Sequence, residues 1–195
     1  MRIGLYGGTF DPVHNAHLAV ARAAVDAFSL DKLLVIPNRL PPHKHSGTAA
    51  SYDDRLKMVG LACETEPKCE ACDIENREGK SFTIQTLERL RIKYSEAVQF
   101  YFLIGADAFA EVLTWFRVGE VFKMTEFIVA ARPGFEYESP AGARVHRLDT
   151  VAYPESSSGI RAQIAAGQTP AGLPASVERY IIKQGLYRAD KANRA

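Results

Sequence analysis

The sequence contains few of the residues and patterns that define several large classes of protein. It has three cysteines and one tryptophan among 195 residues. No apolar run approaches the roughly 20 residues that a membrane span requires. An odd and small number of cysteines argues against a disulfide framework. The formal net charge is only +1, so no broad basic field is available to attract nucleic acid without sequence preference.

What is present has the composition of one ordinary globular domain. Apolar residues make up 47% and charged residues 24% of the chain, and such a chain is long enough to bury a core. The N-terminal MRIGLYGG is typical of a first strand and not of a secretory signal. We therefore expect a cytoplasmic protein without membrane or nucleic-acid partners. A single domain is predicted over residues 1–187, followed by a polar tail over 188–195.

The pair Cys69 and Cys72 forms a C-x-x-C pattern, which can indicate a zinc or redox site. A zinc ribbon needs a second pair, which this sequence lacks. A redox pair usually opens a helix, where the dipole lowers a thiol pKa, whereas KCEACDIE has a strand pattern. We predict structural cysteines and no protein-held metal. A redox or metal-binding protein is the alternative that a zinc or thiol assay would test.

Strand-like and helix-like patterns alternate along the chain. The sequence predicts strands at 2–7, 31–38, 68–75, 98–106, 126–134 and 144–149, and helices at 16–28, 51–64, 82–94, 107–116, 156–167 and 174–185. This alternation predicts an α/β fold with a doubly wound parallel sheet, helices on both faces and right-handed crossovers. Ligands of such sheets bind at the carboxyl ends of the strands.

A phosphate site is predicted where the first strand ends. Gly7 and Gly8 allow backbone amides to approach a ligand closely, and the helix that begins near Ala16 offers unpaired N–H groups and a positive dipole end. His14 and His17 are three residues apart and can lie on the same side of the helix start. They would form a compact donor cluster for phosphate oxygens. The alternative is a glycine-rich turn with two surface histidines.

The whole segment GGTFDPVHNAH, residues 7–17, resembles the signature of the nucleotidylyltransferase superfamily, which has a Rossmann-like fold. Further stretches resemble the bacterial nicotinate-nucleotide adenylyltransferase family, namely PPHK at 41–44, EGKSFTIQTL at 78–87, FLIGADAFAEVLTW at 102–115, AARPG at 130–134 and SSSGIR at 156–161. The resemblance spans residues 1–187. It implies transfer of the adenylyl group of ATP to nicotinate mononucleotide, which gives deamido-NAD and pyrophosphate.

The resemblance also implies roles for individual residues. It assigns ATP binding to Gly7, Gly8, Thr9, Phe10, His14, His17, Gly105, Asp107, Ser157, Ser158 and Arg161. It assigns nicotinate mononucleotide to Lys44, Thr83, Trp115, Phe116 and Arg132. Catalysis is assigned to His17, His14, Lys44 and Arg161. Mg²⁺ is expected with ATP, coordinated mainly by phosphates and water. His43 and His45 flank Lys44, but no carboxylate or cysteine lies at a clear ligand spacing, so no metal site is predicted there.

The SSSGIR stretch supports an anion site on physical grounds as well. Hydroxyl groups and backbone amides at a helix start, with the planar guanidinium of Arg161 one turn on, suit phosphate oxygens.

The sequence departs from the family pattern at three positions. Ala16 replaces the usual glycine, so its methyl group is expected to press toward the nucleotide. Ser158 conservatively replaces the usual threonine. Glu155 replaces an apolar residue and adds negative charge near a triphosphate, which the sequence does not explain.

Several alternatives stay open at this point. A nicotinamide-mononucleotide adenylyltransferase would bind the amide of its substrate with backbone donors, where the nicotinate enzyme binds a carboxylate. The identity of the side chains says little about how backbone donors are arranged, so the sequence does not separate the two. Pantetheine-phosphate and glycerol-phosphate nucleotidylyltransferases share the first motif, but the SFT, GAD and RPG stretches weigh against them. A nucleotide-sensing module that lost the reaction is the alternative from outside enzymes. The sequence leaves a homo-oligomer open.

Overall fold

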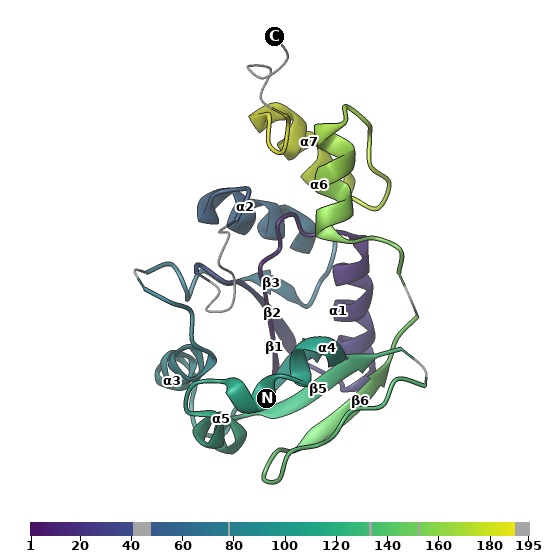
Figure 1. Cartoon of the computed structure of the whole chain (residues 1–195). Coiled ribbons are helices and arrows are strands. Elements are labelled where there is room, and N and C mark those ends of the chain that lie inside the picture. The colour runs from purple at the N-terminus through teal and green to yellow at the C-terminus, as the bar shows by residue number, and fades with distance from the viewer. Residues whose placement is uncertain (41–47, 78, 133, 152, 190–195) are drawn as a thin grey trace.

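The computed structural model describes residues 1–40, 48–77, 79–132, 134–151 and 153–189 (Figure 1). Its sheet has six strands in the order β3-β2-β1-β4-β5-β6, and every neighbouring pair is parallel. The strands are β1 Arg2–Gly8, β2 Lys32–Pro37, β3 Cys69–Ala71, β4 Gln99–Gly105, β5 Glu126–Ala131 and β6 Val145–Asp149. The strand order reverses between β1 and β4, so the predicted doubly wound, Rossmann-like sheet is confirmed.

Helices cover both faces of this sheet (Figure 1). They are α1 Asn15–Ala27, α2 Tyr52–Cys63, α3 Thr83–Lys93, α4 Ala106–Phe109, α5 Val118–Met124, α6 Ser157–Ala165 and α7 Ala175–Gln184, with the short 3₁₀ helix η1 at Val112–Thr114. The core on one face joins the strands to α3, η1 and α5, and the cores on the other face join them to α1 and α2. None of the helices in the described segments combines the length and apolar composition that crossing a membrane requires.

The alternation of side chains along β1 shows why both faces can be covered. Ile3 and Leu5 point into the core beneath α3, whereas Tyr6 packs with the cores beneath α1 and α2. Both Ile3 and Leu5 are fully buried. A strand that is apolar on two faces can only be central in a parallel sheet, and β1 accordingly pairs with both β2 and β4.

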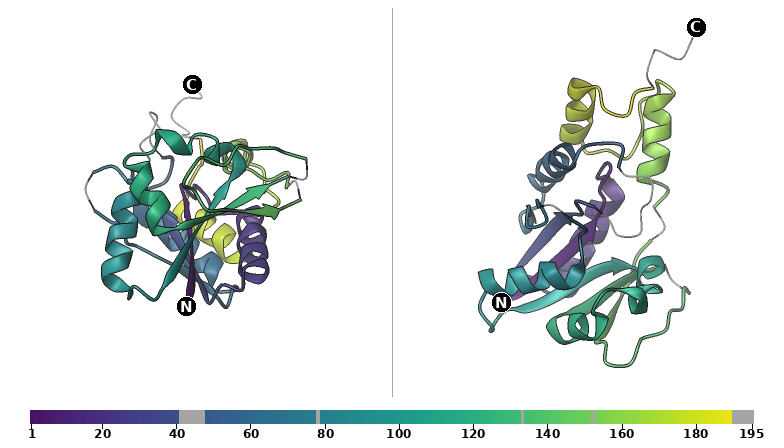
Figure 2. Two further views of the ribbon diagram at one scale, coloured as in Figure 1. Left: turned by 90° about the horizontal axis from the view of Figure 1, so that it is seen from below. Right: turned by 60° about the vertical axis from the view of Figure 1, so that its left-hand side comes forward.

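The two C-terminal helices stand beyond the sheet as a further layer (Figure 2). Val177 and Ile181 of α7 share a buried cluster with Met58 and Val59 of α2. The hydroxyl of Tyr180 donates to Asp54 Oδ1 at 2.9 Å. This packing joins the end of the chain to the helix that follows β2, and it extends the protein over the carboxyl ends of the strands.

Two predicted elements differ in the structure. The strand predicted at 68–75 is only three residues long, since the chain turns away after Ala71. The helix predicted at 107–116 is divided into α4 and η1. It ends at Trp115, whose backbone is extended, and Arg117 beyond it is left-handed, with φ of 55°. Arg117 is the N-cap of α5, a helix that the sequence analysis did not predict. Its guanidinium pairs with Glu88 at 2.9 Å, so a tertiary ion pair accompanies the break.

All three cysteines are free, and Cys63 and Cys72 are buried. Burial raises the pKa of Cys69 to about 11 and that of Cys63 to about 12. Thiolates are the reactive and metal-binding form of cysteine. The thiols of Cys63 and Cys69 are therefore protonated at neutral pH, which favours a role in packing over redox chemistry.

Candidate active site

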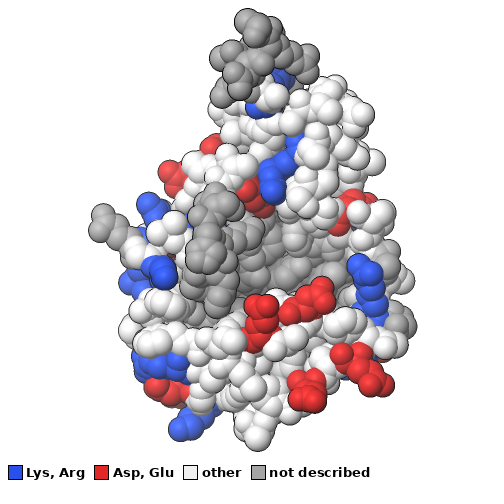
Figure 3. Space-filling view, in the orientation of Figure 1, with Lys and Arg blue, Asp and Glu red and all other residues white. Residues whose placement is uncertain are grey.

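The segment after β1 lies at the carboxyl edge of the sheet, beside the point where strand order reverses. The face shown in Figure 3 is hollowed between the C-terminal helices and the layer below, and acidic side chains lie along the lower edge of the hollow. α1 begins at this edge, and its first residue donates its backbone N–H to the carbonyl of Gly172 at 2.7 Å. Segments far apart in the sequence therefore meet at the start of α1.

Phe10 shapes the turn between β1 and α1. Its backbone is left-handed, with φ of 49°, and its side chain is buried. The ring packs edge-on against Tyr6 and His17, with centroid distances of 5.4 and 5.0 Å. A Cβ on Gly8 would lie 2.8 Å from Cζ of this ring. The sequence predicts that Gly8 leaves room for a ligand. In the structure, the absence of a side chain at Gly8 leaves room for the ring of Phe10.

The two histidines form the close pair that the sequence predicts. Their ring centroids lie 3.7 Å apart, and the backbone N–H of His14 donates to Nδ1 of His17 at 3.2 Å. A backbone N–H can only donate, so Nδ1 of His17 must carry a lone pair. The proton of the neutral ring is therefore on Nε2. This bond leaves His17 with one free donor, which is the arrangement that a phosphate oxygen needs.

Burial controls the protonation of both rings. It lowers the pKa of His14 to about 4 and that of His17 to about 3, from an ordinary value of 6.5. The neighbouring His14 adds to the effect at His17, whereas Glu155 raises the pKa of His14. Without a ligand, both imidazoles are therefore neutral at neutral pH and act as uncharged hydrogen-bond partners.

The depressed pKa of His17 predicts a pH dependence of folding stability. Between pH 6.5 and about 3, the unfolded chain binds a proton at His17 that the folded protein does not. The free energy of unfolding must therefore fall as the pH is lowered through this window. We expect urea unfolding of a His17→Asn variant to show a shallower fall between pH 6.5 and 4.5 than the parent protein shows. Identical slopes for the two proteins would contradict the burial of a neutral ring.

Asp11 joins three segments around the turn. Its buried carboxylate accepts the backbone N–H groups of Ala49 and Ala50 at 2.8 and 3.1 Å. It also accepts the hydroxyl of Tyr187 at 2.8 Å. Burial and this carboxylate raise the pKa of Tyr187, so the phenol stays a donor. The sequence analysis did not predict Asp11 or Tyr187 as parts of the site.

The SSSGIR segment docks directly on the same turn. The hydroxyl of Ser157 donates to the carbonyl of Pro12 at 2.9 Å, and Nη1 of Arg161 donates to the carbonyl of Asp11 at 2.7 Å. Ser156 caps α6, because its hydroxyl accepts the N–H of Gly159 at 3.1 Å. Ser158 is exposed. The structure thus brings both predicted anion motifs together, and Arg161 uses only one of its five donors in this contact.

Arg55 supports the turn from below, and the sequence analysis missed it. Its side chain is fully buried, and Nη1 donates to the carbonyls of Thr9 and Asn38 at 2.7 and 2.8 Å. Burial lowers its pKa, and the nearby Asp11 opposes that effect. A signal was present in the sequence, because Arg55 shares the spacing of the buried residues of α2, Met58, Val59 and Ala62.

Gly105, Asp107 and Arg132 come together at a second part of the carboxyl edge. All three line a cavity of about 290 Å³ beside Tyr6 of β1. Gly105 ends β4 and Asp107 lies in the first turn of α4, while Arg132 follows β5. Asp107 and Arg132 are exposed, so a ligand in this cavity can reach both charges.

Thr83, Trp115 and Phe116 are near the start of α3. Thr83 is its first residue, and the preceding Phe82 packs on Phe116 with ring centroids 5.1 Å apart. Trp115 is half-buried and contacts Phe102 edge-on at 5.5 Å, while Phe116 is exposed. One part of the indole is therefore core. Lys44, His43 and His45 lie outside the described residues.

Ala16 and the remaining first-turn positions can also be placed. The methyl group of Ala16 is buried on α1, with 8% exposure, so little of it is free to meet a nucleotide. A Cβ added at Gly7 would lie 3.3 Å from Cζ of Phe102.

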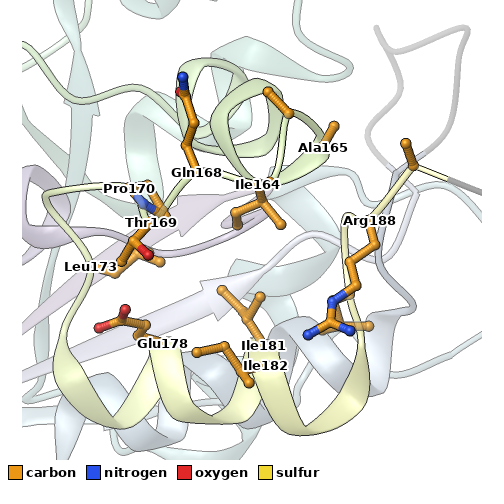
Figure 4. Close-up of a pocket in the computed structure, with 14 residues that line it drawn as sticks. Ile164, Ala165, Gln168, Thr169, Pro170, Leu173, Glu178, Ile181, Ile182 and Arg188 are labelled. Atoms are coloured by element: carbon orange, nitrogen blue, oxygen red, sulfur yellow. The ribbon is translucent and has the colours of Figure 1, made fainter.

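A larger cavity of about 730 Å³ lies between α6 and α7, lined by apolar residues such as Ile164 and Ile181 (Figure 4). It contains none of the predicted site residues.

Comparison with known proteins identifies the family. Residues 5–163 match the cytidylyltransferase-like family model. A protein of Solibacter usitatus described as a probable nicotinate-nucleotide adenylyltransferase is 46% identical over 187 residues, which cover 96% of this chain and 100% of that protein. One of Thermoanaerobacter with the same description is 38% identical, with 99% and 97% covered. This chain belongs to the nicotinate-nucleotide adenylyltransferase family.

Solved structures support the fold of this adenylyltransferase family member. The nicotinic acid mononucleotide adenylyltransferase of Plasmodium falciparum, complexed with APC, matches with a TM-score of 0.77 at 20% identity, and the match covers 95% of this chain and 96% of that one. The same enzyme complexed with NaAD matches with a TM-score of 0.77 at 19% identity, covering 95% and 97%. At such identity the likeness describes the fold alone.

Proposed function

We propose that this chain transfers the adenylyl group of ATP to nicotinate mononucleotide, giving deamido-NAD and pyrophosphate. The observation that carries the proposal is the contact between the two anion motifs. Ser157 and Arg161 of α6 donate to the carbonyls of Pro12 and Asp11, so the backbone amides at the start of α6, the remaining guanidinium donors and the imidazoles converge on one edge of the sheet. That set of donors suits a polyphosphate.

The chemistry requires positioning more than proton transfer. A phosphate oxygen of the mononucleotide attacks the α-phosphorus of ATP, the bond from that phosphorus to the bridging oxygen of the β-phosphate breaks, and pyrophosphate leaves. The attacking group is already an anion, so no general base is needed and no covalent enzyme intermediate forms. The contribution of the protein is to align the two phosphates and stabilise the developing charge.

In this proposal the histidine pair contacts the α-phosphate. His17 offers Nε2–H, because its Nδ1 is engaged with the backbone of His14. Arg161, with Ser157 and Ser158 at the start of α6, binds the β- and γ-phosphates. Gly105 and Asp107 contact the nucleoside, at the 290 Å³ cavity that Arg132 also lines. The role of Lys44 stays a prediction from the resemblance.

The acceptor would bind between α3 and the segment after η1. The N-terminus of α3 begins at Thr83, and unpaired amides at a helix start favour a carboxylate such as that of nicotinate. Trp115 and Phe116 offer aromatic surface to the electron-poor pyridinium ring, which the negative face of an indole attracts. Mg²⁺ would arrive with ATP. The donors at the turn are imidazole, hydroxyl and guanidinium groups, which fit phosphate oxygens and leave the cation to phosphates and water.

We further propose a cytoplasmic location and no nucleic-acid partner. Two alternative functions are compatible with the same fold, and they differ from the proposal in the acceptor used or in whether pyrophosphate is released. A nicotinamide-mononucleotide adenylyltransferase would present the same phosphate chemistry to an amide acceptor. A nucleotide-binding module would bind ATP and release no pyrophosphate.

Pyrophosphate release tests the proposal directly. We expect turnover with ATP, Mg²⁺ and nicotinate mononucleotide, and a kcat/KM at least about 100-fold lower with nicotinamide mononucleotide, because donors arranged for a carboxylate are poorly matched by an amide. Reactions without either mononucleotide serve as the control. Preference for the amide would overturn the acceptor. Saturable ATP binding without any release would overturn the reaction and favour the binding module.

A further inference from the structure

Glu75 is a buried acid in the segment between β3 and α3. The residue is 6% exposed, and its Oε1 accepts the hydroxyl of Thr86 at 2.9 Å. Thr86 lies on α3 and is itself buried, with 3% exposure. Because a hydrogen bond between two buried side chains is directional and shielded from water, this bond can fix the orientation of the helix relative to the segment before it.

Thr86 belongs to the first turn of α3. The helix begins at Thr83, and Phe82 is its N-cap. The backbone N–H groups of Gln85 and Thr86 both donate to the carbonyl of Phe82, at 3.0 and 3.3 Å. The backbone of Thr86 therefore closes the turn, while its side chain is bonded outside the helix, to Glu75. The orientation of the turn depends on that bond.

The start of α3 has no side-chain cap. Ser81 precedes the N-cap, but its Oγ accepts the backbone N–H groups of Arg39 and Leu40, at 3.0 and 3.4 Å. No acceptor for the N–H groups of Thr83 and Ile84 is present among the described residues. Unpaired N–H groups at a helix start bind anions, so this turn can receive the carboxylate of nicotinate.

The same turn contacts the aromatic surface proposed for the pyridinium ring. The ring of Phe82 packs on that of Phe116, with centroids 5.1 Å apart, and Phe116 follows Trp115 in the chain. A displacement of the turn would therefore move both the donors for the carboxylate and a residue that packs on the aromatic surface. Both parts of the acceptor site depend on how the first turn of α3 is held.

We propose that Glu75 is a positioning residue for the acceptor mononucleotide. Through Thr86 it holds the N–H groups of Thr83 and Ile84 in the orientation that binds the nicotinate carboxylate. The proposal rests on the proposed adenylyl transfer and deepens it, because it concerns how the acceptor is bound. Neither partner of the bond belongs to either anion motif. Loss of the bond should therefore weaken binding of the acceptor and leave binding of ATP intact.

Thr86→Val removes the hydroxyl and keeps the shape of the side chain. We expect the KM for nicotinate mononucleotide to rise about tenfold while the KM for ATP stays unchanged, because a small misplacement of a positioned group can cost as much as about 10²-fold. Thr86→Ser keeps the hydroxyl and should retain both KM values of the parent protein. Equal rises in both KM values, or a Thr86→Ser protein as impaired as Thr86→Val, would overturn the proposal.

Thr125→Val is the matched control, because it also removes a buried hydroxyl bond. Thr125 is 1% exposed, and its hydroxyl donates to the carbonyls of Phe100 and Glu126, both at 3.1 Å. It immediately precedes β5, so it lies at the amino ends of the strands, opposite the candidate site. Both KM values should equal those of the parent. A KM for nicotinate mononucleotide raised as much as in Thr86→Val would show a general effect of lost stability and reject the positioning role.

A double variant, Glu75→Met with Thr86→Val, separates positioning from stability. Replacing both partners by apolar groups of similar shape restores much of the stability that the loss of one partner costs. Apolar contact is non-directional, so it cannot fix the turn as the hydrogen bond does. The urea midpoint of the double variant should lie closer to the parent than that of Thr86→Val, while the KM for nicotinate mononucleotide stays raised. A KM that recovers together with the midpoint would overturn the proposal.

The orientation of the turn can also be measured without ligand or turnover. Residual dipolar couplings of the Thr83 and Ile84 N–H groups report their directions by NMR. They should change in Glu75→Met and in Thr86→Val, and stay as in the parent in Thr125→Val. Unchanged couplings in the first two variants would overturn the proposal. Because this measurement needs no reaction, a parent protein that releases no pyrophosphate with either mononucleotide would count against the proposed function alone.

Discussion

Replacing His17 by alanine is expected to lower kcat for pyrophosphate release by about 10²- to 10³-fold, the effect of removing one donor aimed at developing charge. The Nε2–H of His17 is the donor left free by the bond between its Nδ1 and the backbone of His14. If this donor acts mainly in the transition state, KM for ATP should change only a few-fold. Steady-state kinetics with both substrates varied would separate the two parameters.

A matched histidine elsewhere controls for the substitution itself. His146 lies on β6 and bonds to Glu126 at 2.6 Å, outside every part of the candidate site. His146→Ala removes no group of the candidate site, so in the folded protein it should keep the kcat of the parent within about twofold. A folded His17→Ala protein that turns over as fast as His146→Ala would remove His17 from the catalytic group.

The parts of the site that follow local rules could be predicted from the sequence. The glycine pair, the two histidines and the serine-capped start of α6 are each contiguous motifs next to a strand end or helix start. Because parallel strands all deliver their carboxyl ends to one edge, such motifs converge there without knowledge of tertiary contacts. The SSSGIR segment and the first turn meet in the structure for this reason.

The parts that depend on through-space partners could not be predicted. Tyr187 bonds to Asp11 across 176 positions of the sequence, and no local pattern links the two residues. The break before α5 lies at the left-handed Arg117, whose guanidinium pairs with Glu88 of α3 and with Glu120 of α5. Gly8 was assigned to ligand access because its conflict with the Phe10 ring exists only once the turn has formed. In each case the feature involves a contact that exists only in the folded protein, and at Arg117 and Phe10 the backbone adopts a left-handed conformation that the local sequence disfavours.

Arg55 is expected to be the largest single contributor to stability near the site. An Arg55→Met variant would keep most of the volume and remove the donors to the carbonyls of Thr9 and Asn38, which Nη1 bonds at 2.7 and 2.8 Å. Each buried carbonyl left unpaired costs about 1–3 kcal/mol. The nearby Asp11 would also lose a favourable charge. We therefore expect the free energy of unfolding to fall by about 3 kcal/mol or more, measured by urea unfolding at pH 7.

Lys57 provides the matched control, because it is an exposed cation on the same helix. Lys57→Met should change the free energy of unfolding by no more than about 0.5 kcal/mol. Equal unfolding midpoints for the two variants would show that Arg55 contributes only volume. If Arg55→Met is destabilised as expected, kcat of the remaining folded protein should fall as well, because Arg55 joins the end of β1 to the end of β2 directly below the turn that carries the histidines. The donor geometry of His14 and His17 would then depend on a buried cation that lies in neither anion motif.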